Sequence, residues 1–308
     1  MPNRPAVETF KLGTRGSKLA RTQSQLIADQ LSAIGGFEVE LVQIRTDGDV
    51  LTGPLSQMGG TGVFVTALRE AVLNGSVDFA VHSLKDLPTA AAPGMKIAAI
   101  PARAEVRDAL CSRSNRSLAE LATGAKVGTG SPRRAAQLRA ARADIEVIDI
   151  RGNVDTRLAR LENDLDAVVL AAAGLGRIGR SAAISELFDD AVMLPAPGQG
   201  ALAVETALDV PTELAAALAA IDDADSRLAV TAERALLARL EAGCSAPVGA
   251  FAQRKGSMLR LEACICSLDG SRVIRQAKAT DGLAEVAATL LGIELAESML
   301  ADGAADLL

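Results

Sequence analysis

Arginine and hydroxyl side chains gather in four short glycine-bearing segments, each of which follows a strand-like apolar run. The segments are residues 13–17, 128–134, 151–157 and 173–177. In an open α/β sheet, ligands bind at the carboxyl ends of the strands, where helix N-termini present free N–H groups to anions. N-capping serines and solvated arginines would account for any one segment. Four together predict a site for several negative charges, which suits the bidentate guanidinium of arginine.

Another cluster of polar residues follows the apolar run 77–81 and contains His82, Ser83, Lys85 and Asp86. An ion pair with Lys85 would explain Asp86 without any function. Beside an anion site, however, Asp86 could stabilise a developing cation or transfer protons. His82 could act as a base, but a lone histidine beside a strand is more often a hydrogen-bonded structural residue.

Cys244 lies among small residues in the segment 242–247, after a long predicted helix. Accessibility favours a reactive thiol there, although an isolated loop cysteine is more often incidental. No histidine accompanies it, so a cysteine protease would lack its base. We expect Cys111, Cys264 and Cys266 to be structural, reduced thiols. Their spacing matches no zinc pattern, and we predict no bound metal.

The composition disfavours several other classes of protein. The net charge is −6 and tryptophan and tyrosine are absent, which disfavours a nucleic-acid partner. Of the 32 basic residues 7 are lysine, which leaves 25 arginines. No apolar run approaches the roughly 18 residues that span a bilayer. The N-terminal segment lacks the apolar core of a secretory signal, so a cytoplasmic location is predicted. The glycine segments match neither a Walker loop nor a dinucleotide fingerprint.

Short apolar runs alternate with helical patterns from the start of the chain. Strands are expected at residues 10–14, 37–44, 77–81, 145–150 and 167–170, and another ends at Val127. Helices are expected at residues 17–34, 63–73, 132–141, 154–161 and about 226–241. This rhythm predicts α/β domains with mainly parallel, doubly wound sheets. After a proline-rich crossover at residues 194–200, three strand-like segments and a final helix predict a small α+β domain.

Taken in order, these segments resemble the porphobilinogen deaminase family, also called the hydroxymethylbilane synthases. The resemblance rests on residues 12–20, 48–50, 80–88, 127–138, 150–158, 172–177, 194–205 and 233–249. The Val-His-Ser-x-Lys-Asp and Gly-Cys-Ser-x-Pro stretches are together highly specific. The resemblance implies an enzyme that condenses four porphobilinogen molecules, each with an acetate and a propionate group, into linear hydroxymethylbilane with loss of ammonia.

The resemblance also implies a dipyrromethane cofactor held by a thioether to Cys244. Asp86 would be the catalytic residue, which supports loss of ammonia, stabilises an azafulvene-like cation and assists proton removal. The cofactor-binding residues implied are Cys244, Asp86, Lys85, Ser83, Arg133, Arg134, Thr129 and Ser131. The substrate-binding residues implied are Arg15, Ser17, Arg151, Arg157, Arg177 and Gln199. Thr61 stands in a glycine loop where we expect lysine in many relatives, so the role of that lysine is not carried over.

The family architecture implied is two doubly wound domains like those of periplasmic binding proteins, with the active site in the cleft between them, and a small α+β C-terminal domain. We place domain 1 at residues 1–101 and 200–220, domain 2 at 102–199 and domain 3, with the cofactor loop, at 221–308. A monomer without a membrane partner is expected. Two alternatives stay open. A non-catalytic solute-binding or sensor protein for a poly-anion would not need Cys244, and a cysteine-dependent transferase would need a base beside it.

Overall fold

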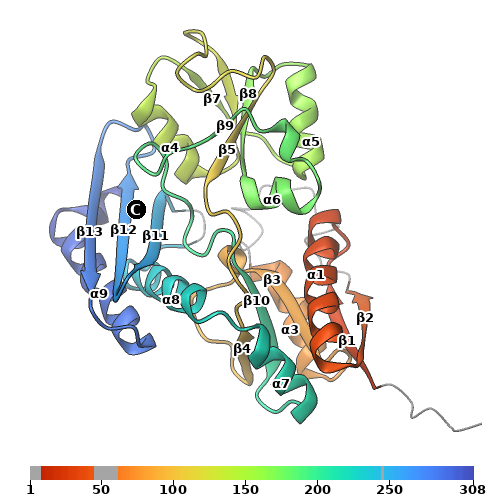
Figure 1. Ribbon diagram of the computed structural model, residues 1–308. Coiled ribbons are helices and arrows are strands. Elements are labelled where there is room, and N and C mark those ends of the chain that lie inside the picture. The colour runs from red at the N-terminus through yellow and green to blue at the C-terminus, as the bar shows by residue number, and fades with distance from the viewer. Residues whose placement is uncertain (1–7, 45–61, 244–245) are drawn as a thin grey trace, which may run out of the picture. The chain divides into compact units, whose positions relative to one another are not determined.

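The computed structural model describes residues 8–44, 62–243 and 246–308, which form a mixed α/β chain (Figure 1). The chain divides into two compact units, Met1–Arg103 with Ala201–Asp223 and Ala104–Gly200 with Ala224–Leu308. Among the described residues, the first unit holds one β-sheet and the second holds two. The further division of the second unit into domains 2 and 3 stays a prediction.

Five strands form the sheet of the first unit, in the order β2-β1-β3-β10-β4. Their bounds are β1 Thr9–Thr14, β2 Glu38–Gln43, β3 Phe79–Ser83, β4 Met95–Ala99 and β10 Leu202–Ala207. β1 is parallel to β2 and β3, whereas β10 is antiparallel to both of its neighbours, β3 and β4. The sheet is therefore mainly parallel, as expected, apart from the strand that returns after the excursion through the second unit.

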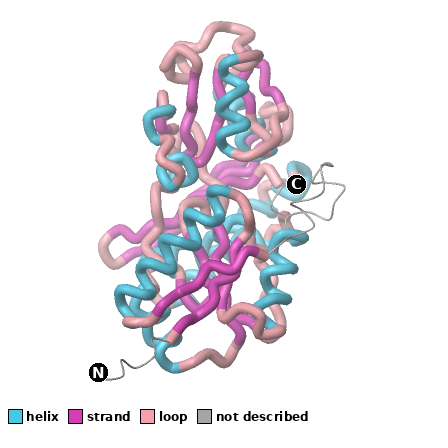
Figure 2. The backbone as a smooth tube through the Cα atoms, turned by 90° about the vertical axis from the view of Figure 1, so that its right-hand side faces the viewer, coloured by secondary structure: helices cyan, strands magenta, loops and turns pink. Residues whose placement is uncertain are grey.

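Helices cover both faces of this sheet (Figure 2). Helices α1 (Lys18–Gly35) and α7 (Thr212–Ile221) pack on one face, and α3 (Gly62–Leu73) packs on the other. Alternation along β3 explains the two layers, because successive side chains of a strand point to opposite faces. Phe79 and Val81 join the core beneath α1 and α7, whereas Ala80 joins the core beneath α3.

The second unit contains a similar α/β sheet, in the order β7-β6-β8-β5-β9. Its strands are β5 Asp108–Ser112, β6 Lys126–Gly128, β7 Glu146–Ile148, β8 Ala167–Ala171 and β9 Glu186–Leu187. Its helices are α4 Pro132–Ala141, α5 Val154–Ala159 and α6 Ala172–Arg177, with the 3-10 turns η2 Arg160–Glu162 and η3 Ser181–Ala183. β6 is parallel to β7 and β8, whereas β5 is antiparallel to β8 and β9. The strand order again interleaves segments that are distant in the sequence.

The rest of the second unit is an antiparallel sheet covered by two helices (Figure 1). Its strands are β11 Val248–Lys255, β12 Met258–Cys266 and β13 Val273–Thr280. Its helices are α8 Ala224–Arg239 and α9 Glu285–Ala301, followed by the 3-10 turn η4 Ala304–Leu307. Their apolar side chains share one core with the inward face of the sheet. This is the small α+β region that the sequence predicted.

Three of the four cysteines lie in the described residues, and all three are buried and free. Cys264 and Cys266 occupy alternate positions on β12, as their spacing predicts, and Cys111 lies in β5. Nothing in the described ranges forms a helix that is long and apolar enough to cross a membrane.

Candidate active site

In the first unit, the carboxyl ends of two parallel strands bring two predicted segments together. Thr14 ends β1 and Ser83 ends β3, and these strands are neighbours. Helix α1 starts at this edge with Ser17 as its N-cap, whose Oγ accepts a 3.2 Å hydrogen bond from the first turn. Gln23 Nε2 donates to Ser83 Oγ at 2.9 Å, and Ser24 Oγ donates to Thr14 Oγ1 at 2.8 Å. Helix α1 therefore ties the turn after β1 to the turn after β3.

Asp86 lies exposed in the single 3-10 turn η1 (Leu84–Asp86) that follows β3. The N–H of Leu84 donates to the carbonyl of Ala201 at 3.0 Å, and the N–H of Leu87 donates to the carbonyl of Leu84 at 3.0 Å. Leu84 and Leu87 are 0% and 2% exposed, so the turn is anchored on both sides of the carboxylate. Among the residues that the structure describes, the Asp86 carboxylate forms no hydrogen bond or ion pair, so the alternative of an ion pair with Lys85 is not realised.

The other predicted residues of this unit lie at the same edge. Arg15 and Ser17 follow β1, and Ser83 and Lys85 accompany Asp86 after β3. The first four of these residues are half-buried. Cationic and hydroxyl groups therefore lie in the two turns beside the exposed carboxylate, an arrangement that can bind an anion while a positive charge develops nearby.

His82 is buried in β3 and belongs to an ionic cluster inside the first unit. Its Nε2 lies 3.2 Å from Glu205 Oε2, and Arg69 donates from Nε and Nη2 to the two oxygens of Glu205 at 3.0 and 2.7 Å. Glu205 is 2% exposed. Burial raises the pKa of Glu205, but the close approach of His82 and the bonds from Arg69 outweigh it and lower that pKa from 4.5 to about 2. His82 thus has the structural role that its position beside a strand favours.

Substituting Glu205→Gln should destabilise the protein in a pH-dependent manner. Because its folded-state pKa is lowered, Glu205 contributes stability above its unfolded pKa, worth about 3 kcal/mol at pH 7, and this is lost as pH falls toward 2. Urea unfolding should show the difference from wild type shrinking by about 1 kcal/mol at pH 3.5. Glu70→Gln, an exposed position on α3, serves as the control and should differ by less than about 0.5 kcal/mol. A difference at Glu205 that does not change with pH would contradict the assignment.

In the second unit, three neighbouring parallel strands end at one edge of their sheet, and each end leads into a predicted segment. Residues 128–134 follow β6 and enter α4, with Ser131 as N-cap and Pro132 as first helical residue. Residues 151–157 follow β7 and enter α5. Residues 173–177 lie in α6, which follows β8 directly. The structure therefore gathers three of the four predicted anion-binding segments at one edge.

Gly130 allows two of these segments to touch. A Cβ at this position would lie 2.4 Å from the carbonyl oxygen of Ile150, where β7 gives way to the next turn. Thr129 is buried and Ser131 is half-buried on either side of this contact. Only glycine fits such a close backbone approach, so the residue type itself sets the distance between the turns after β6 and β7.

Three further arginines of this edge bond to other groups of the second unit. Arg157 is half-buried and its Nε donates to the carbonyl of Gly152 at 2.8 Å. Arg177 Nη2 donates to the carbonyl of Gly200 at 2.7 Å. Arg151 is exposed and pairs with Asp149 at 3.3 Å. Burial lowers the pKa of Arg157, and the guanidiniums of Arg134 and Arg151 lower it further. The edge therefore concentrates positive charge, since arginine remains protonated at neutral pH.

Arg133 and Arg134 are buried in the first turn of α4, with exposed fractions of 3% and 6%. Both pair with Asp108, at 2.8 and 2.7 Å. Gln199, which is 0% exposed, also donates to Asp108 at 2.9 Å. The sequence did not predict a role for Asp108, because β5 was not among the expected strands. The signal available was a charged residue at the head of the apolar run Ala-Leu-Cys.

Comparison with known proteins identifies the family. A family model described as the dipyrromethane cofactor binding domain of porphobilinogen deaminase matches residues 10–215, and one described as the C-terminal domain of porphobilinogen deaminase matches residues 227–301. The chain belongs to the porphobilinogen deaminase family. This match over nearly the whole length disfavours the alternative of a non-catalytic solute-binding or sensor protein.

Curated porphobilinogen deaminases match nearly the whole chain. Porphobilinogen deaminase 1 of Streptomyces coelicolor is 53% identical over 313 residues, which cover 98% of each chain. The porphobilinogen deaminase of Mycolicibacterium paratuberculosis is 52% identical over 97% of this chain and 96% of its own. That of Cutibacterium acnes is 51% identical over 97% of both chains.

Solved structures similar to this chain include periplasmic binding proteins. The methionine-binding protein MetQ is 14% identical with a TM-score of 0.43, covering 68% of this chain and 89% of its own. A periplasmic substrate-binding protein of an ABC transporter from Coxiella burnetii is 16% identical with a TM-score of 0.42, covering 69% of this chain and 91% of its own.

A dipyrromethane, the cofactor of the deaminase family, fits the chemistry of the second unit's arginine edge. Such a group carries several carboxylates, and the edge presents Arg133, Arg134, Arg157 and Arg177 with Asp108 among them. Arg133 Nε is buried and has no hydrogen-bond partner among the described residues. The predicted attachment residue Cys244, like Thr61 and the Gly48–Val50 stretch of the resemblance, lies outside the described residues.

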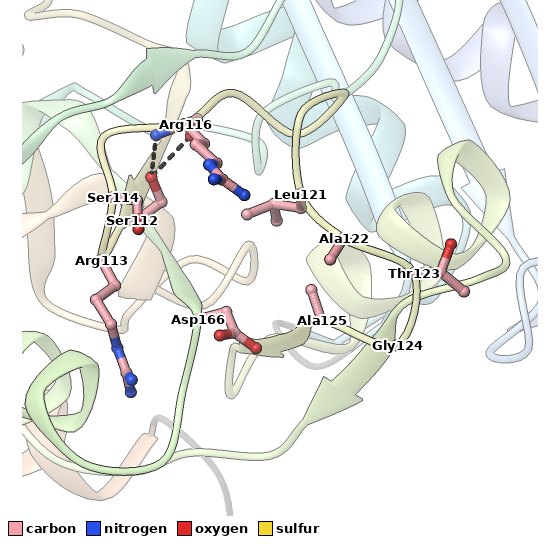
Figure 3. Close-up of a pocket in the computed structure, with 10 residues that line it drawn as sticks. All are labelled: Ser112, Arg113, Ser114, Arg116, Leu121, Ala122, Thr123, Gly124, Ala125 and Asp166. Carbon is pink, nitrogen blue, oxygen red and sulfur yellow. Dashed lines mark hydrogen bonds between the residues drawn. The ribbon is translucent and has the colours of Figure 1, made fainter.

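A separate open pocket of about 200 Å³ lies at the opposite edge of the same sheet of the second unit (Figure 3). Its lining comes from residues 112–114 and Arg116, from residues 121–125 before β6, and from Asp166 before β8. The guanidinium of Arg113, on one side of the pocket, donates to the carbonyls of Leu161 and Leu165 at 2.7 and 3.0 Å. No group of side chains that could hold a metal ion occurs within residues 8–44, 62–243 and 246–308.

Proposed function

We propose that the chain condenses four porphobilinogen molecules head to tail and, with the addition of one water, releases hydroxymethylbilane and four ammonia molecules, with a dipyrromethane bound at Cys244 as the primer. The gathering of arginine-bearing turns at the carboxyl ends of β6, β7 and β8 carries this proposal, because each substrate brings two carboxylates. Membership of the porphobilinogen deaminase family over nearly the whole chain supports it, and the activity is that of a deaminating transferase.

The carboxylate-binding roles divide between cofactor and substrate. We assign Ser83, Lys85, Thr129, Ser131, Arg133 and Arg134 to the dipyrromethane, with Cys244 as its covalent anchor. We assign Arg15, Ser17, Arg151, Arg157 and Arg177 to the incoming porphobilinogen. The bound pyrrole chain gains two negative charges with each unit added. A site with guanidiniums in several turns can therefore bind it better than one arginine pair could.

The reaction requires one group that can face a positive charge and accept a proton. In each condensation the carbon–nitrogen bond of the aminomethyl group breaks and ammonia leaves. That methylene carbon then bonds to a pyrrole carbon of the acceptor, which loses a proton. When bound, the dipyrromethane supplies the pyrrole carbon that accepts the first substrate. Asp86, exposed and without a partner among the described residues, stabilises the positive charge that develops on the substrate and takes up the proton.

Arg157→Gln should raise KM for porphobilinogen at least about tenfold, because a charge-assisted bond to a substrate carboxylate is worth roughly 1.5–3 kcal/mol. Arg113→Gln is the matched control. It lies at the other edge of the same sheet and, like Arg157, bonds to backbone carbonyls. Its KM should stay within about twofold of wild type. Equal changes in the two variants, measured by initial rates over a range of porphobilinogen concentrations, would count against the arginine edge as the substrate site.

We also propose that the enzyme acts as a cytoplasmic monomer on this small-molecule substrate, without a nucleic-acid or membrane partner. The net charge of −6 supports the absence of a nucleic-acid partner, since phosphates repel an acidic protein. The reaction needs no second copy of the chain, because one chain contains every residue assigned above.

A further inference from the structure

Two buried guanidiniums share one buried carboxylate at the start of α4. Asp108 is the first residue of β5, where it pairs in register with Ala171 at the carboxyl end of β8. It is 0% exposed. Arg134 donates to Asp108 Oδ1 from Nε at 2.9 Å and from Nη2 at 2.7 Å, while Arg133 Nη2 lies 2.8 Å from Oδ2. Each oxygen of the Asp108 carboxylate therefore pairs with a different arginine.

Further hydrogen bonds hold the guanidiniums of Arg133 and Arg134 and the carboxylate of Asp108 in place. Arg133 Nη1 donates to the carbonyl of Leu194 at 2.6 Å, and Arg134 Nη1 donates to the carbonyl of Val169 at 3.1 Å. Gln199 Nε2 donates to Asp108 Oδ1 at 2.9 Å, and it also lies 2.8 Å from the carbonyl of Val106. The orientation of both guanidiniums is thus set by bonds within the second unit.

The charges in this cluster do not cancel. Two guanidiniums face one carboxylate, so one positive charge remains for an anion from outside. Burial lowers the pKa of Arg133, and the charge of Asp108 opposes that effect. Without Asp108, two adjacent buried cations would repel each other and turn toward solvent. The carboxylate therefore keeps two like charges at a fixed, close spacing, which is the arrangement that a molecule with several carboxylates requires.

We infer that Asp108 is a positioning residue, which holds Arg133 and Arg134 where the carboxylates of the dipyrromethane bind, and that Gln199 acts through Asp108 rather than on the substrate. This inference rests on the proposed function. An ion pair that served stability alone would leave cofactor binding unchanged in the folded protein. If Asp108 positions the two arginines, removing its carboxylate lowers the fraction of folded chains that carry the dipyrromethane.

Asp108→Asn tests the inference in the full-length protein. Intact-mass spectrometry measures the fraction of folded chains that carry the dipyrromethane, and initial rates separate kcat from KM. We expect occupancy to fall below half of wild type and KM to rise at least about tenfold, as for a lost charged partner. Asp108→Glu, which keeps the charge on a longer side chain, should recover part of the occupancy. Folded Asp108→Asn with full occupancy and KM within twofold of wild type would overturn the inference.

Glu262→Gln is the control for loss of an arginine–carboxylate pair away from the arginine edge. Glu262 accepts from Arg275 Nε at 2.7 Å in the C-terminal sheet. This variant should keep full occupancy and an unchanged KM. If Asp108→Asn does not fold, Asp108→Glu and Gln199→Met decide the matter. Both should fold with lowered occupancy, and full occupancy in both would reject the positioning role.

A direct readout keeps this inference separate from the proposed function. The side-chain Nε–H signals of Arg133 and Arg134 in a ¹⁵N NMR spectrum should be protected from solvent exchange in wild type. They should lose that protection in Asp108→Asn, whether or not the enzyme turns over. Unchanged protection would reject the role of Asp108. Wild-type protein that carries no dipyrromethane and makes no bilane would instead reject the proposed function.

Discussion

Asp86→Asn should lower the rate of bilane formation at least about 1,000-fold, because it removes both the negative charge that faces the developing cation and the proton acceptor. The fold should remain, since the turn is anchored by Leu84 and Leu87 rather than by the carboxylate. The free energy of unfolding should therefore change by less than about 0.5 kcal/mol. Ammonia release and bilane formation, measured together, would show whether both halves of the condensation stop.

The control for this variant is Asp29→Asn, an exposed carboxylate of α1 that accepts a 2.8 Å hydrogen bond from Gln25. It should retain wild-type turnover. Substantial turnover in Asp86→Asn would remove Asp86 from the mechanism. A loss of dipyrromethane together with a loss of turnover would assign Asp86 to cofactor assembly as well.

Cys244→Ser should eliminate the covalent dipyrromethane and with it bilane formation. A thioether needs sulfur, so the intact mass of the variant should equal that of its bare chain. Wild type should exceed its own chain mass by two porphobilinogen units less two ammonia molecules. The enzyme would then lack the acceptor for the first condensation, and turnover should fall below detection, by about 1,000-fold or more.

Cys111→Ala is the matched control, because Cys111 is a buried cysteine of the same chain. It is 0% exposed, and burial raises the pKa of its thiol to about 11. It is therefore a neutral thiol at pH 7 and a poor nucleophile. The variant should carry the full cofactor mass. Active wild-type enzyme whose mass matches the bare chain would exclude Cys244 as an anchor.

Local sequence signals predicted the elements that place the candidate site. Helix α4 has the bounds that the sequence predicts, because Ser131 and Pro132 mark its start unambiguously. Ser17 is likewise the N-cap of the expected first helix. The short strand β3 lies two residues later than expected, since a continuous apolar run gives no periodic signal for its ends. Turn chemistry was therefore a better guide than hydrophobicity to where side chains emerge.

Long-range pairing could not be predicted in this way. Strand β5 and its Asp108 were not foreseen, although Asp108 sets the environment of both arginines of α4. The sequence suggested that Gln199 binds substrate, whereas its amide is buried against Asp108. Gln199 and Asp108 are 91 positions apart, and a contact at that separation produces no periodic pattern in the sequence. Only the folded structure shows that the two residues are neighbours. The roles of the arginines in binding remain predictions for the kinetics to test.

The place of β10 in the first sheet constrains when the first unit can fold during synthesis of the chain. β10 lies between β3 and β4, yet it is encoded after the whole intervening α/β sheet. During synthesis, β3 and β4 leave the ribosome long before the strand that joins them. The first unit therefore cannot close its sheet until residues 202–207 are available. A chain that is still growing would expose the unpaired edges of β3 and β4 throughout that interval, which is the period when a chaperone would be most useful.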